Sequence, residues 1–173
     1  QDSGACNLLS QKVNCAVLNA GDGSREHPTQ ALLDLYTIEK ECQSHGTKID
    51  GLHIAMIGDL KYGRTVHSLC KLLSLYNNIH FTLISPTELA MPESILTAIT
   101  NGGHKLTITD QLSGSVDADI CYQTRIQEER FTSQDEADKF RGKFRLDQAI
   151  YTKHFQSKTV IMHPLQRDSR AEA

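Results

Sequence analysis

Short apolar runs alternate with helix-like stretches along most of this 173-residue chain, and no other feature constrains its fold as strongly. Runs typical of buried strands occur at residues 15–19, 53–58, 80–85, 105–109, 119–124 and 159–163. Apolar residues spaced three and four apart predict helices at residues 28–42, 65–76, 92–100 and about 133–140. Strands that alternate with helices favour parallel pairing, because each parallel connection needs a crossover. We therefore predict an α/β protein: a doubly wound, mainly parallel sheet with helices on both faces.

The polar segment at residues 43–48 interrupts this alternation and is typical of a domain boundary. We expect residues 1–43 to close one domain and supply a linking helix, and residues 44–173 to form a second domain. Residues 1–13 resemble the end of a helix rather than the start of a domain, and the chain begins with Gln1 instead of Met. We therefore expect a processed chain or a portion of something longer.

The composition is that of an ordinary folded protein, with 39% hydrophobic residues, 23% charged residues and a net charge of −3. This balance argues against disorder and against the basic surface that nucleic-acid binding requires. No apolar run approaches the roughly 20 residues of a membrane span, and no signal peptide is visible. The composition thus predicts no nucleic-acid partner and no membrane association.

Cysteine and histidine usage bears on redox compartment and on metals. The five cysteines are widely spaced, odd in number and without a Cys-x-x-Cys pair, so we expect packed thiols in a reducing cytoplasm. Among the eight histidines, no two stand at helical ligand spacing with a carboxylate partner. We therefore expect no metal.

The Gly-rich turn at residues 21–30 joins the apolar run 15–19 to the helix that starts at Pro28. Pro28 suits a first helical turn, because the N–H that proline lacks would have no helical partner there. The turn brings His27 and Gln30 to a helix start beside a strand end, where free N–H groups and the helix dipole favour an anion. A plain turn with a structural histidine is the alternative, and the clustering of polar side chains favours a site.

The turn at residues 58–65 matches the P-loop pattern G-x-x-x-x-G-K-[ST] except for Arg64 in the lysine position. A P-loop wraps its backbone amides round phosphate, and Asp59 would put a carboxylate into that nest. Leu60 and Tyr62 are also bulky for such a loop. We therefore favour Arg64 as a binder of carboxylate or phosphate through its planar guanidinium, with a surface ion pair as the weaker alternative.

Two further polar clusters follow apolar runs. Arg125 and Gln127 stand two residues apart, so an extended backbone would point both to one side. Arg130, beside two glutamates, is more easily explained as a solvated charge. Pro164 and Leu165 follow the last apolar run. Because parallel strands end at one edge of a sheet, we expect these clusters to converge there, with two arginines placed to hold two carboxylates.

Several segments resemble, in order and in spacing, the aspartate carbamoyltransferase family. They are Asp22-Gly23-Ser24, His27-Pro28-Thr29-Gln30, Gly58-Asp59-Leu60-Lys61-Tyr62-Gly63-Arg64-Thr65-Val66-His67-Ser68, Thr124-Arg125-Ile126-Gln127 and His163-Pro164-Leu165. Together they cover nearly the whole chain. Ornithine carbamoyltransferases share His-Pro-x-Gln, but they typically carry Cys at the position of Thr29, and the Thr-Arg-x-Gln segment suits an acidic substrate.

The resemblance implies transfer of a carbamoyl group from carbamoyl phosphate to the amino group of L-aspartate, an early step of pyrimidine synthesis. By motif, His27 would donate to the carbamoyl carbonyl oxygen, where negative charge develops, and Gln30 would hold the carbamoyl amide. Arg64 would bind the α-carboxylate of aspartate. Arg125, aided by Gln127, would bind its side-chain carboxylate.

The backbone carbonyls of Pro164 and Leu165 would, by the same resemblance, accept from the amino and carbamoyl nitrogens. The resemblance implies no metal and no organic cofactor, so catalysis would rest mainly on orientation and electrostatics. It also implies a homotrimer for the complete protein.

The chain departs from the family in what it lacks and at two positions. The phosphate-binding Ser-Thr-Arg-Thr motif of a preceding domain is absent, as are the Ser- and Lys-bearing loop of a neighbouring subunit and the C-terminal helix. The resemblance makes residues 1–43 the end of the carbamoyl-phosphate-binding domain and residues 44–173 the aspartate-binding domain, and we expect the isolated chain to be inactive. Glu128 replaces a common Lys, and Gln166 replaces a Pro. Since a cis bond before Gln166 would cost about 2.5–4 kcal/mol, we expect a trans bond after Leu165.

Two other functions stay open. A non-catalytic homologue would serve as a dicarboxylate-binding or assembly module. An unrelated nucleotide-binding domain would be built on residues 58–65. Ligand binding separates the three alternatives. An aspartate carbamoyltransferase would bind aspartate-like dicarboxylates, an assembly module would bind no small molecule, and a nucleotide-binding domain would bind a nucleotide.

Overall fold

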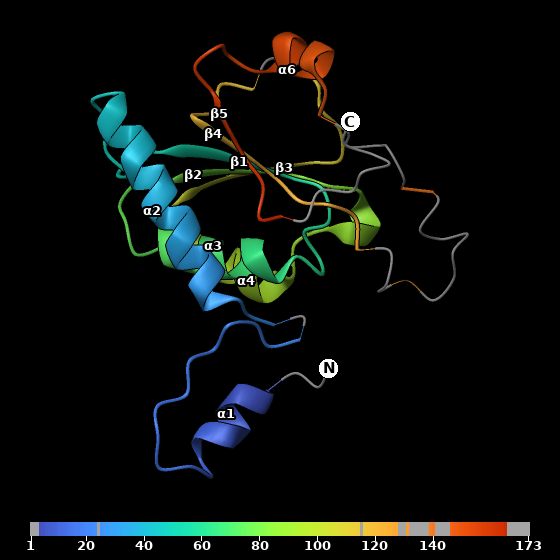
Figure 1. Cartoon of the computed structure of the whole chain (residues 1–173). Coiled ribbons are helices and arrows are strands. Elements are labelled where there is room, and N and C mark those ends of the chain that lie inside the picture. The colour runs from blue at the N-terminus through green and yellow to red at the C-terminus, as the bar shows by residue number, and fades with distance from the viewer. Residues whose placement is uncertain are drawn as a thin grey trace.

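Five parallel strands form the sheet in the computed structural model of this chain, which describes residues 4–23, 25–114, 116–127, 131, 139–140 and 146–165 (Figure 1). The strands are β1 His53–Ile57, β2 His80–Ile84, β3 Lys105–Thr109, β4 Ile120–Gln123 and β5 Val160–Met162. Their order across the sheet is β3-β2-β1-β4-β5, and neighbouring strands are parallel. The chain thus moves outward from β1 to β3 and then returns to add β4 and β5 on the other side. This confirms the doubly wound prediction and puts the switch point between β1 and β4.

The central strand β1 is covered on both faces of the sheet. Ile54 and Met56 pack into one core, whereas Ala55 and Ile57 pack into another, and all four are buried. Successive side chains of a strand point to opposite faces, so a strand covered on both sides is apolar at every position. This is why the run at residues 53–58 reads as continuously apolar rather than alternating.

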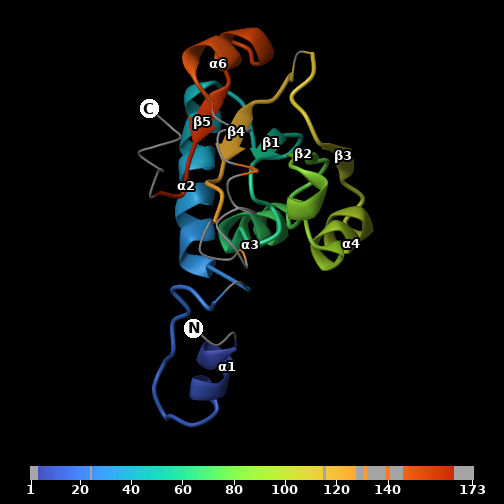
Figure 2. The same ribbon diagram turned by 90° about the vertical axis from the view of Figure 1, so that its right-hand side faces the viewer.

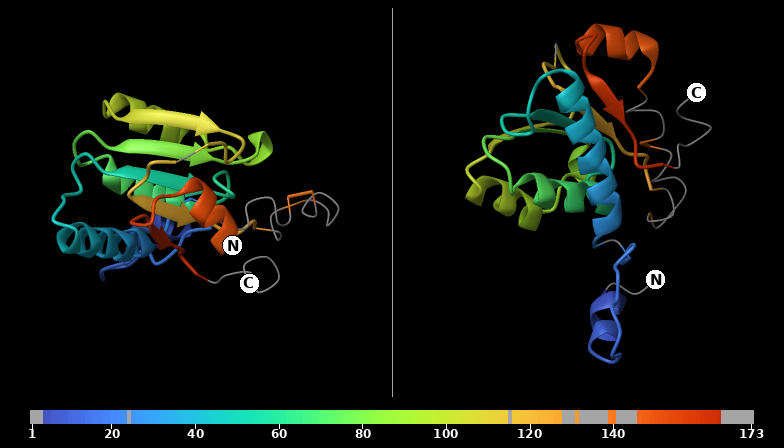
Figure 3. Two further views of the ribbon diagram at one scale, coloured as in Figure 1. Left: turned by 90° about the horizontal axis from the view of Figure 1, so that it is seen from above. Right: turned by 60° about the vertical axis from the view of Figure 1, so that its left-hand side comes forward.

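Helices cover both faces of the sheet, as predicted (Figures 2 and 3). Three of them, α2 Pro28–Ser44, α3 Arg64–Leu73 and α4 Glu93–Asn101, lie on one face, and α6 Gln148–His154 lies on the other. A 3-10 turn, Thr87–Leu89, follows β2, and α1 Ala5–Ser10 stands apart from the sheet beyond the start of α2. Helix α2 packs against α3, and α3 packs against α4.

The larger core lies between the sheet and these three helices. Ile38 of α2 and Val66, Leu69 and Leu73 of α3 are fully buried in it. Burying one such side chain stabilises a fold by about 1.5–3 kcal/mol. The smaller core, under α6, includes Phe155. The apolar side chains whose spacing predicted the helices are therefore the ones that pack the helices against the sheet.

The prediction of a strand at residues 15–19 was wrong. Within the described residues this segment pairs with no strand, Cys15 is exposed, and 85% of the Leu18 surface is accessible. An apolar run becomes a strand only where a neighbour pairs its N–H and C=O groups and covers its side chains. Neither condition is met in this part of the structure.

Helix α6 was not predicted from the sequence. Asp147 caps this helix by accepting the Ile150 N–H at Oδ1, at 2.9 Å. With seven residues, the helix is too short to show a helical period, so its cap was the one available signal. Most of the helix expected at residues 133–140 lies outside the described residues, and residues 139–140 form a turn.

All five cysteines are free, and Cys42, Cys70 and Cys121 are buried. Burial raises the pKa of the Cys70 thiol and raises that of Cys121 to about 12, so both stay protonated and unreactive. Among the described residues, no helix combines the length and apolarity needed to cross a membrane.

Candidate functional site

The candidate site lies where β1, β4 and β5 end and where α2 and α3 begin. Parallel pairing brings the segments after these strands, residues 58–63, 124–127 and 163–165, to the same edge of the sheet. This edge, at the switch point between β1 and β4, is where ligands bind in open α/β sheets. The convergence of strand ends expected from the sequence is therefore present in the backbone.

Gly58 lets the chain leave β1 in close contact with the end of β4. Its φ is +116°, and a Cβ on it would lie 2.3 Å from the backbone oxygen of Thr124. Only glycine tolerates both the dihedral angle and this approach. The Thr124 N–H donates to the Ile57 carbonyl at 2.8 Å. The turn after β1 and the segment that carries Arg125 are thus joined directly.

His27 is the N-cap of α2, followed by Pro28 in the first turn as the sequence predicted. The His27 Nδ1 atom accepts the backbone N–H of Gln30 at 3.3 Å, and the Thr29 hydroxyl lies 3.4 Å from the same nitrogen. The ring therefore satisfies one of the N–H groups that a helix start leaves without a partner.

This cap determines which nitrogen of His27 carries the proton. Because Nδ1 accepts a hydrogen bond, the neutral ring has its hydrogen on Nε2. Burial, and after it the positive charge of Arg64, lowers the pKa of His27 below its ordinary value, so the ring is neutral at pH 7. His27 can therefore offer an Nε2–H donor to an oxygen without being charged.

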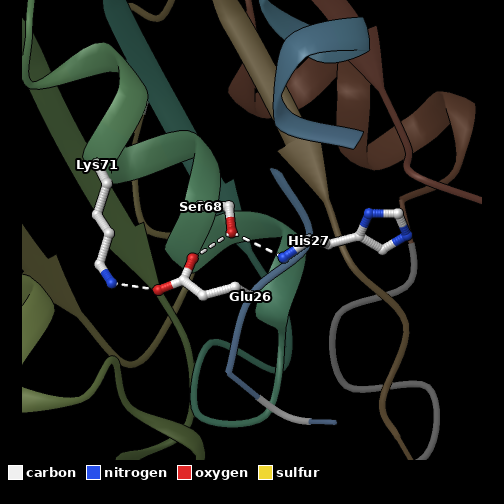
Figure 4. A network of polar contacts seen from close by, with 4 residues as sticks. All are labelled: Glu26, His27, Ser68 and Lys71. Atoms are coloured by element: carbon white, nitrogen blue, oxygen red, sulfur yellow. Dashed lines mark hydrogen bonds and ion pairs between the residues drawn. The ribbon is translucent and has the colours of Figure 1, made fainter. Parts of the chain in front are cut away.

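A network of polar contacts holds the backbone of His27 from behind (Figure 4). The His27 N–H donates to Ser68 Oγ at 2.9 Å, Ser68 donates to Glu26 Oε2 at 2.6 Å, and Lys71 pairs with Glu26 Oε1. Burial alone would raise the pKa of Glu26, but the bonds from Lys71 and Ser68 lower it below its ordinary value. The His27 ring points away from this network, so α3 fixes its position without occupying the ring. This network was not predicted from the sequence.

Arg64, the first residue of α3, reaches back to the Gly-rich turn. Its Nη1 donates to the Gly23 carbonyl at 3.0 Å, and a Cβ on Gly21 would lie 2.9 Å from the same nitrogen. Gly21 has a φ of +131°, so the turn needs glycine there for its dihedral angle, and the guanidinium of Arg64 packs against it. The charge of Arg64 acts on the His27 ring. The structure thus brings these two predicted site residues together.

The loop at residues 58–63 contains a carboxylate, Asp59, that accepts a hydrogen bond from a backbone N–H of the same loop. Asp59 is fully buried, and its oxygens accept the N–H of Tyr62 at 2.9 Å and the N–H of Gln127 at 3.3 Å. Burial raises the pKa of Asp59, although these bonds oppose the shift. The loop amide of Tyr62, which a P-loop would turn towards phosphate, therefore faces Asp59, and this counts against a nucleotide site here.

Gln127 and Arg125 follow β4 as expected. The Gln127 side chain donates to the Tyr62 carbonyl at 2.9 Å, so this residue fastens the segment after β4 to the loop after β1. Arg125 is half-buried, and its Nη1 donates to the Ile126 carbonyl at 3.4 Å. Both side chains thus lie at the strand-end edge of the sheet.

Pro164 and Leu165 follow β5, beside the end of β4. Leu165 has a φ of +57°, which is uncommon for a residue with a side chain, and its N–H donates to His163 Nδ1 at 2.9 Å. Residues 128 and 166 lie outside the described residues. The peptide bond between Leu165 and Gln166, which we expect to be trans, therefore falls outside them as well.

Gln30 belongs to a second network that the sequence analysis missed. Its Nε2 donates to Asp34 Oδ1 at 3.0 Å, and the hydroxyl of Tyr122 donates to Asp34 Oδ2 at 2.6 Å. Asp34 and Tyr122 are both buried. A charged residue on the apolar face of the helix predicted at residues 28–42 was the signal that could have found it.

A hollow of about 320 Å³ lies between α2 and α3, on the side of the Glu26 network. Mostly apolar side chains line it, and its lining contains none of the predicted site residues. The candidate site is therefore the strand-end edge with His27, Gln30 and Arg64, rather than this hollow.

Comparison with known proteins identifies related sequences for both parts of the chain. The Asp/Orn binding domain of aspartate/ornithine carbamoyltransferase matches residues 50–172, and the carbamoyl-P binding domain of the same family matches residues 2–40. The aspartate carbamoyltransferase catalytic subunit of Cellvibrio japonicus is 66% identical over 158 residues, which make up 91% of this chain and 47% of that relative.

Solved structures are similar over the same extent. The catalytic subunit of M. jannaschii aspartate transcarbamoylase matches with a TM-score of 0.81 and 42% identity, over 96% of this chain and 53% of that one. The Trypanosoma cruzi aspartate transcarbamoylase in complex with carbamoyl phosphate and aspartate matches with a TM-score of 0.83 and 39% identity, over 96% of this chain and 54% of that one. The chain thus spans about half the length of these relatives.

Proposed function

Because the chain belongs to the aspartate/ornithine carbamoyltransferase family, we propose that it is a portion of an aspartate carbamoyltransferase. The complete protein would transfer the carbamoyl group of carbamoyl phosphate to L-aspartate, giving N-carbamoyl-L-aspartate and phosphate in de novo pyrimidine synthesis. The observation that carries this proposal is the neutral His27 ring, which offers Nε2–H at the start of α2 beside Arg64.

His27 would act on the carbamoyl carbonyl. As the aspartate amine attacks the carbonyl carbon, negative charge develops on the oxygen, and a fixed N–H donor stabilises it. The Ser68 contact and the α2 cap hold His27 in place before substrate arrives, so little reorganisation accompanies the reaction. Gln30 would hold the carbamoyl amide one turn of helix away.

Two arginines would hold the two carboxylates of aspartate. Arg64 uses one N–H on Gly23, which leaves further donors of its guanidinium fork for the α-carboxylate. Arg125, with Gln127, would take the side-chain carboxylate. The carbonyls of Pro164 and Leu165 would accept from the amino and carbamoyl nitrogens. The reaction needs no metal or organic cofactor in this scheme.

Each part of the chain would supply one half of this site. Residues 1–43 would be the end of the carbamoyl-phosphate-binding domain with its linking helix, and residues 44–173 the aspartate-binding domain; the two family matches support this division. The Ser-Thr-Arg-Thr phosphate motif does not occur in this sequence, so the isolated chain would be inactive. We place the complete protein in the cytoplasm, where free thiols persist, as a homotrimer.

Isothermal titration of the chain with succinate, N-carbamoyl-L-aspartate and ATP tests the proposal. We expect both dicarboxylates to bind and ATP not to bind, and we expect Arg125→Gln to weaken the binding of both dicarboxylates. A chain that binds ATP, or neither dicarboxylate, would contradict the proposal. Light scattering of a complete enzyme containing this segment tests the trimer, and a monomer would contradict it.

A further inference from the structure

The buried carboxylate of Asp34 lies between two side chains from different parts of the chain. Gln30, one turn earlier on α2, donates its amide Nε2–H to Oδ1 at 3.0 Å. Tyr122, 88 positions along the sequence and on β4, donates its hydroxyl to Oδ2 at 2.6 Å. Asp34 is 5% exposed and Tyr122 is fully buried, so the Tyr122 contact is shielded from bulk water, and the contact with Gln30 is partly buried.

The chemistry of a carboxylate decides which way the Gln30 amide faces. An ionised carboxylate can only accept hydrogen bonds, whereas a glutamine amide has a donating end and an accepting end. Rotating the amide by half a turn would set Oε1 against Asp34 Oδ1 and leave an unpaired buried acceptor pair, which is costly. Asp34 therefore holds Nε2 towards itself and leaves Oε1 at the other end of the amide of the half-buried Gln30.

The charged state of Asp34 is supported by both of its neighbours. Burial raises the pKa of Asp34, while the hydrogen bonds from Tyr122 and Gln30 oppose that rise. The carboxylate accepts from both donors, and a protonated oxygen would have to give one of them up. The interaction with His27, the N-cap residue of the same helix, also opposes the rise in pKa, more weakly than these hydrogen bonds.

We propose that Asp34 is a positioning residue that orients the Gln30 amide so that its carbonyl oxygen meets the substrate, and that this orientation selects an NH2 group at the carbamoyl end. Tyr122 fixes the orienting carboxylate. An N-acyl group that carries a methyl in place of NH2 leaves Oε1 without a donor and is bound more weakly. This inference rests on the proposed function, because it assumes that Gln30 contacts the carbamoyl group.

The same contacts join the two halves of the proposed site. Tyr122 lies three residues before Arg125, so the hydroxyl that holds Asp34 comes from the strand that delivers the arginine for the aspartate side chain. Removing that hydroxyl loosens the orientation of Gln30 without touching any group that contacts substrate.

The test compares N-carbamoyl-L-aspartate with N-acetyl-L-aspartate, which differ only by NH2 against CH3 at the terminal position. Their affinities are measured by calorimetry on the chain at pH 8, with wild type, Asp34→Asn, Tyr122→Phe and Gln30→Met. Arg125→Gln is the matched control. Circular dichroism and the thermal midpoint check that each variant is folded.

We expect wild type to prefer the carbamoyl ligand by about three- to tenfold, the worth of one hydrogen bond. Gln30→Met and Asp34→Asn should each reduce the preference to the part that the Pro164 and Leu165 carbonyls supply, and the double variant should lose no more than either single one. Tyr122→Phe should reduce it in part, and remains informative if Asp34→Asn does not fold. Arg125→Gln should weaken both ligands equally and so leave the ratio unchanged.

Failure of the inference and failure of the proposed function look different. If neither ligand binds to wild type, the proposed function fails. If both bind but the preference is undiminished in Asp34→Asn and in Tyr122→Phe, the proposed function stands and Asp34 does not orient Gln30. A wild-type ratio of one overturns the selection of NH2.

Discussion

The imidazole rings of His53 and His80 lie stacked across the paired strands β1 and β2, with their centroids 3.8 Å and their planes 14° apart. His53 Nε2 lies 2.8 Å from the Thr82 hydroxyl, and His80 Nε2 lies 3.0 Å from the Thr107 hydroxyl. Burial, and after it the charges of His53 and Lys105, lowers the pKa of His80 to about 4. Burial also lowers the pKa of His53, opposed by the Asp117 carbonyl and by the charges of Asp117 and Asp119.

This stack makes stability depend on pH. An unfolded histidine has a pKa near 6.5, above the folded value of about 4 for His80, so the unfolded chain binds more protons between these values. The free energy of unfolding should therefore fall as the pH drops from about 6.5 towards 4. Urea unfolding at pH 7 and at pH 4.5 measures the fall, and His80→Gln should make it smaller. An equal fall in wild type and variant would contradict the prediction.

Gly58→Ala should destabilise the fold much more than Gly103→Ala. Both glycines have positive φ values, so a side chain at either position costs about 1–2 kcal/mol of backbone strain. At Gly103 a Cβ has no atom within 4 Å, whereas at Gly58 it would lie 2.3 Å from the Thr124 oxygen. The forced backbone shift should cost a further 1–3 kcal/mol or so. Chemical denaturation of both variants measures the difference, and equal destabilisation would show that β1 and β4 do not approach so closely.

Arg125→Ala, in a full-length enzyme that contains this segment, should damage the use of aspartate far more than the binding of carbamoyl phosphate. Losing a charge-assisted contact to a carboxylate should cost on the order of 2–5 kcal/mol. Steady-state kinetics with each substrate varied separately measures both effects. Lys153→Ala, an exposed change in α6, is the control and should alter neither. A comparable loss of carbamoyl phosphate affinity would assign Arg125 to the other substrate.

The isolated chain should not make N-carbamoyl-L-aspartate at a useful rate. On the proposed function, the leaving phosphate would be held by a Ser-Thr-Arg-Thr motif that this sequence does not contain, so the chain would supply only one half of the site for the carbamoyl donor. A radiometric assay with labelled carbamoyl phosphate, run beside a full-length homologue, measures this. Turnover near the rate of the homologue would overturn the prediction, and adding a separately made N-terminal domain should restore activity if the halves dock.

Periodicity in the sequence was sufficient to predict the sheet. The runs at residues 53–58 and 80–85 became β1 and β2 within one residue at each end, because an apolar run bounded by turn residues has few other ways to bury its side chains. The same holds for α2, whose start at Pro28 was predicted from the missing N–H of proline. These are local properties, readable from a short window.

Prediction from short stretches of sequence failed where contacts with a distant segment decide the secondary structure. Residues 15–19 have the composition of a strand, yet no described strand pairs with them, and α6 depends on a single cap at Asp147. The candidate residues at the strand ends were named from their motif. The positions of the candidate residues that the structure describes became known only from the fold. The hydrogen bond from Gln127 to Tyr62 is one example.

The sequence by itself thus determined the alternation of strands and helices, the turns that need glycine and the residue types at the strand ends. Only the tertiary structure decided that the Asp59 carboxylate accepts the Tyr62 N–H and that Arg64 lies beside His27. The same is true of the hydrogen bond from Tyr122 to the Asp34 carboxylate, next to Gln30. The physical reason is range. Propensity and periodicity act within a few residues, whereas hydrogen bonds between buried polar groups join atoms that only the packing of the whole sheet brings within 3 Å or so.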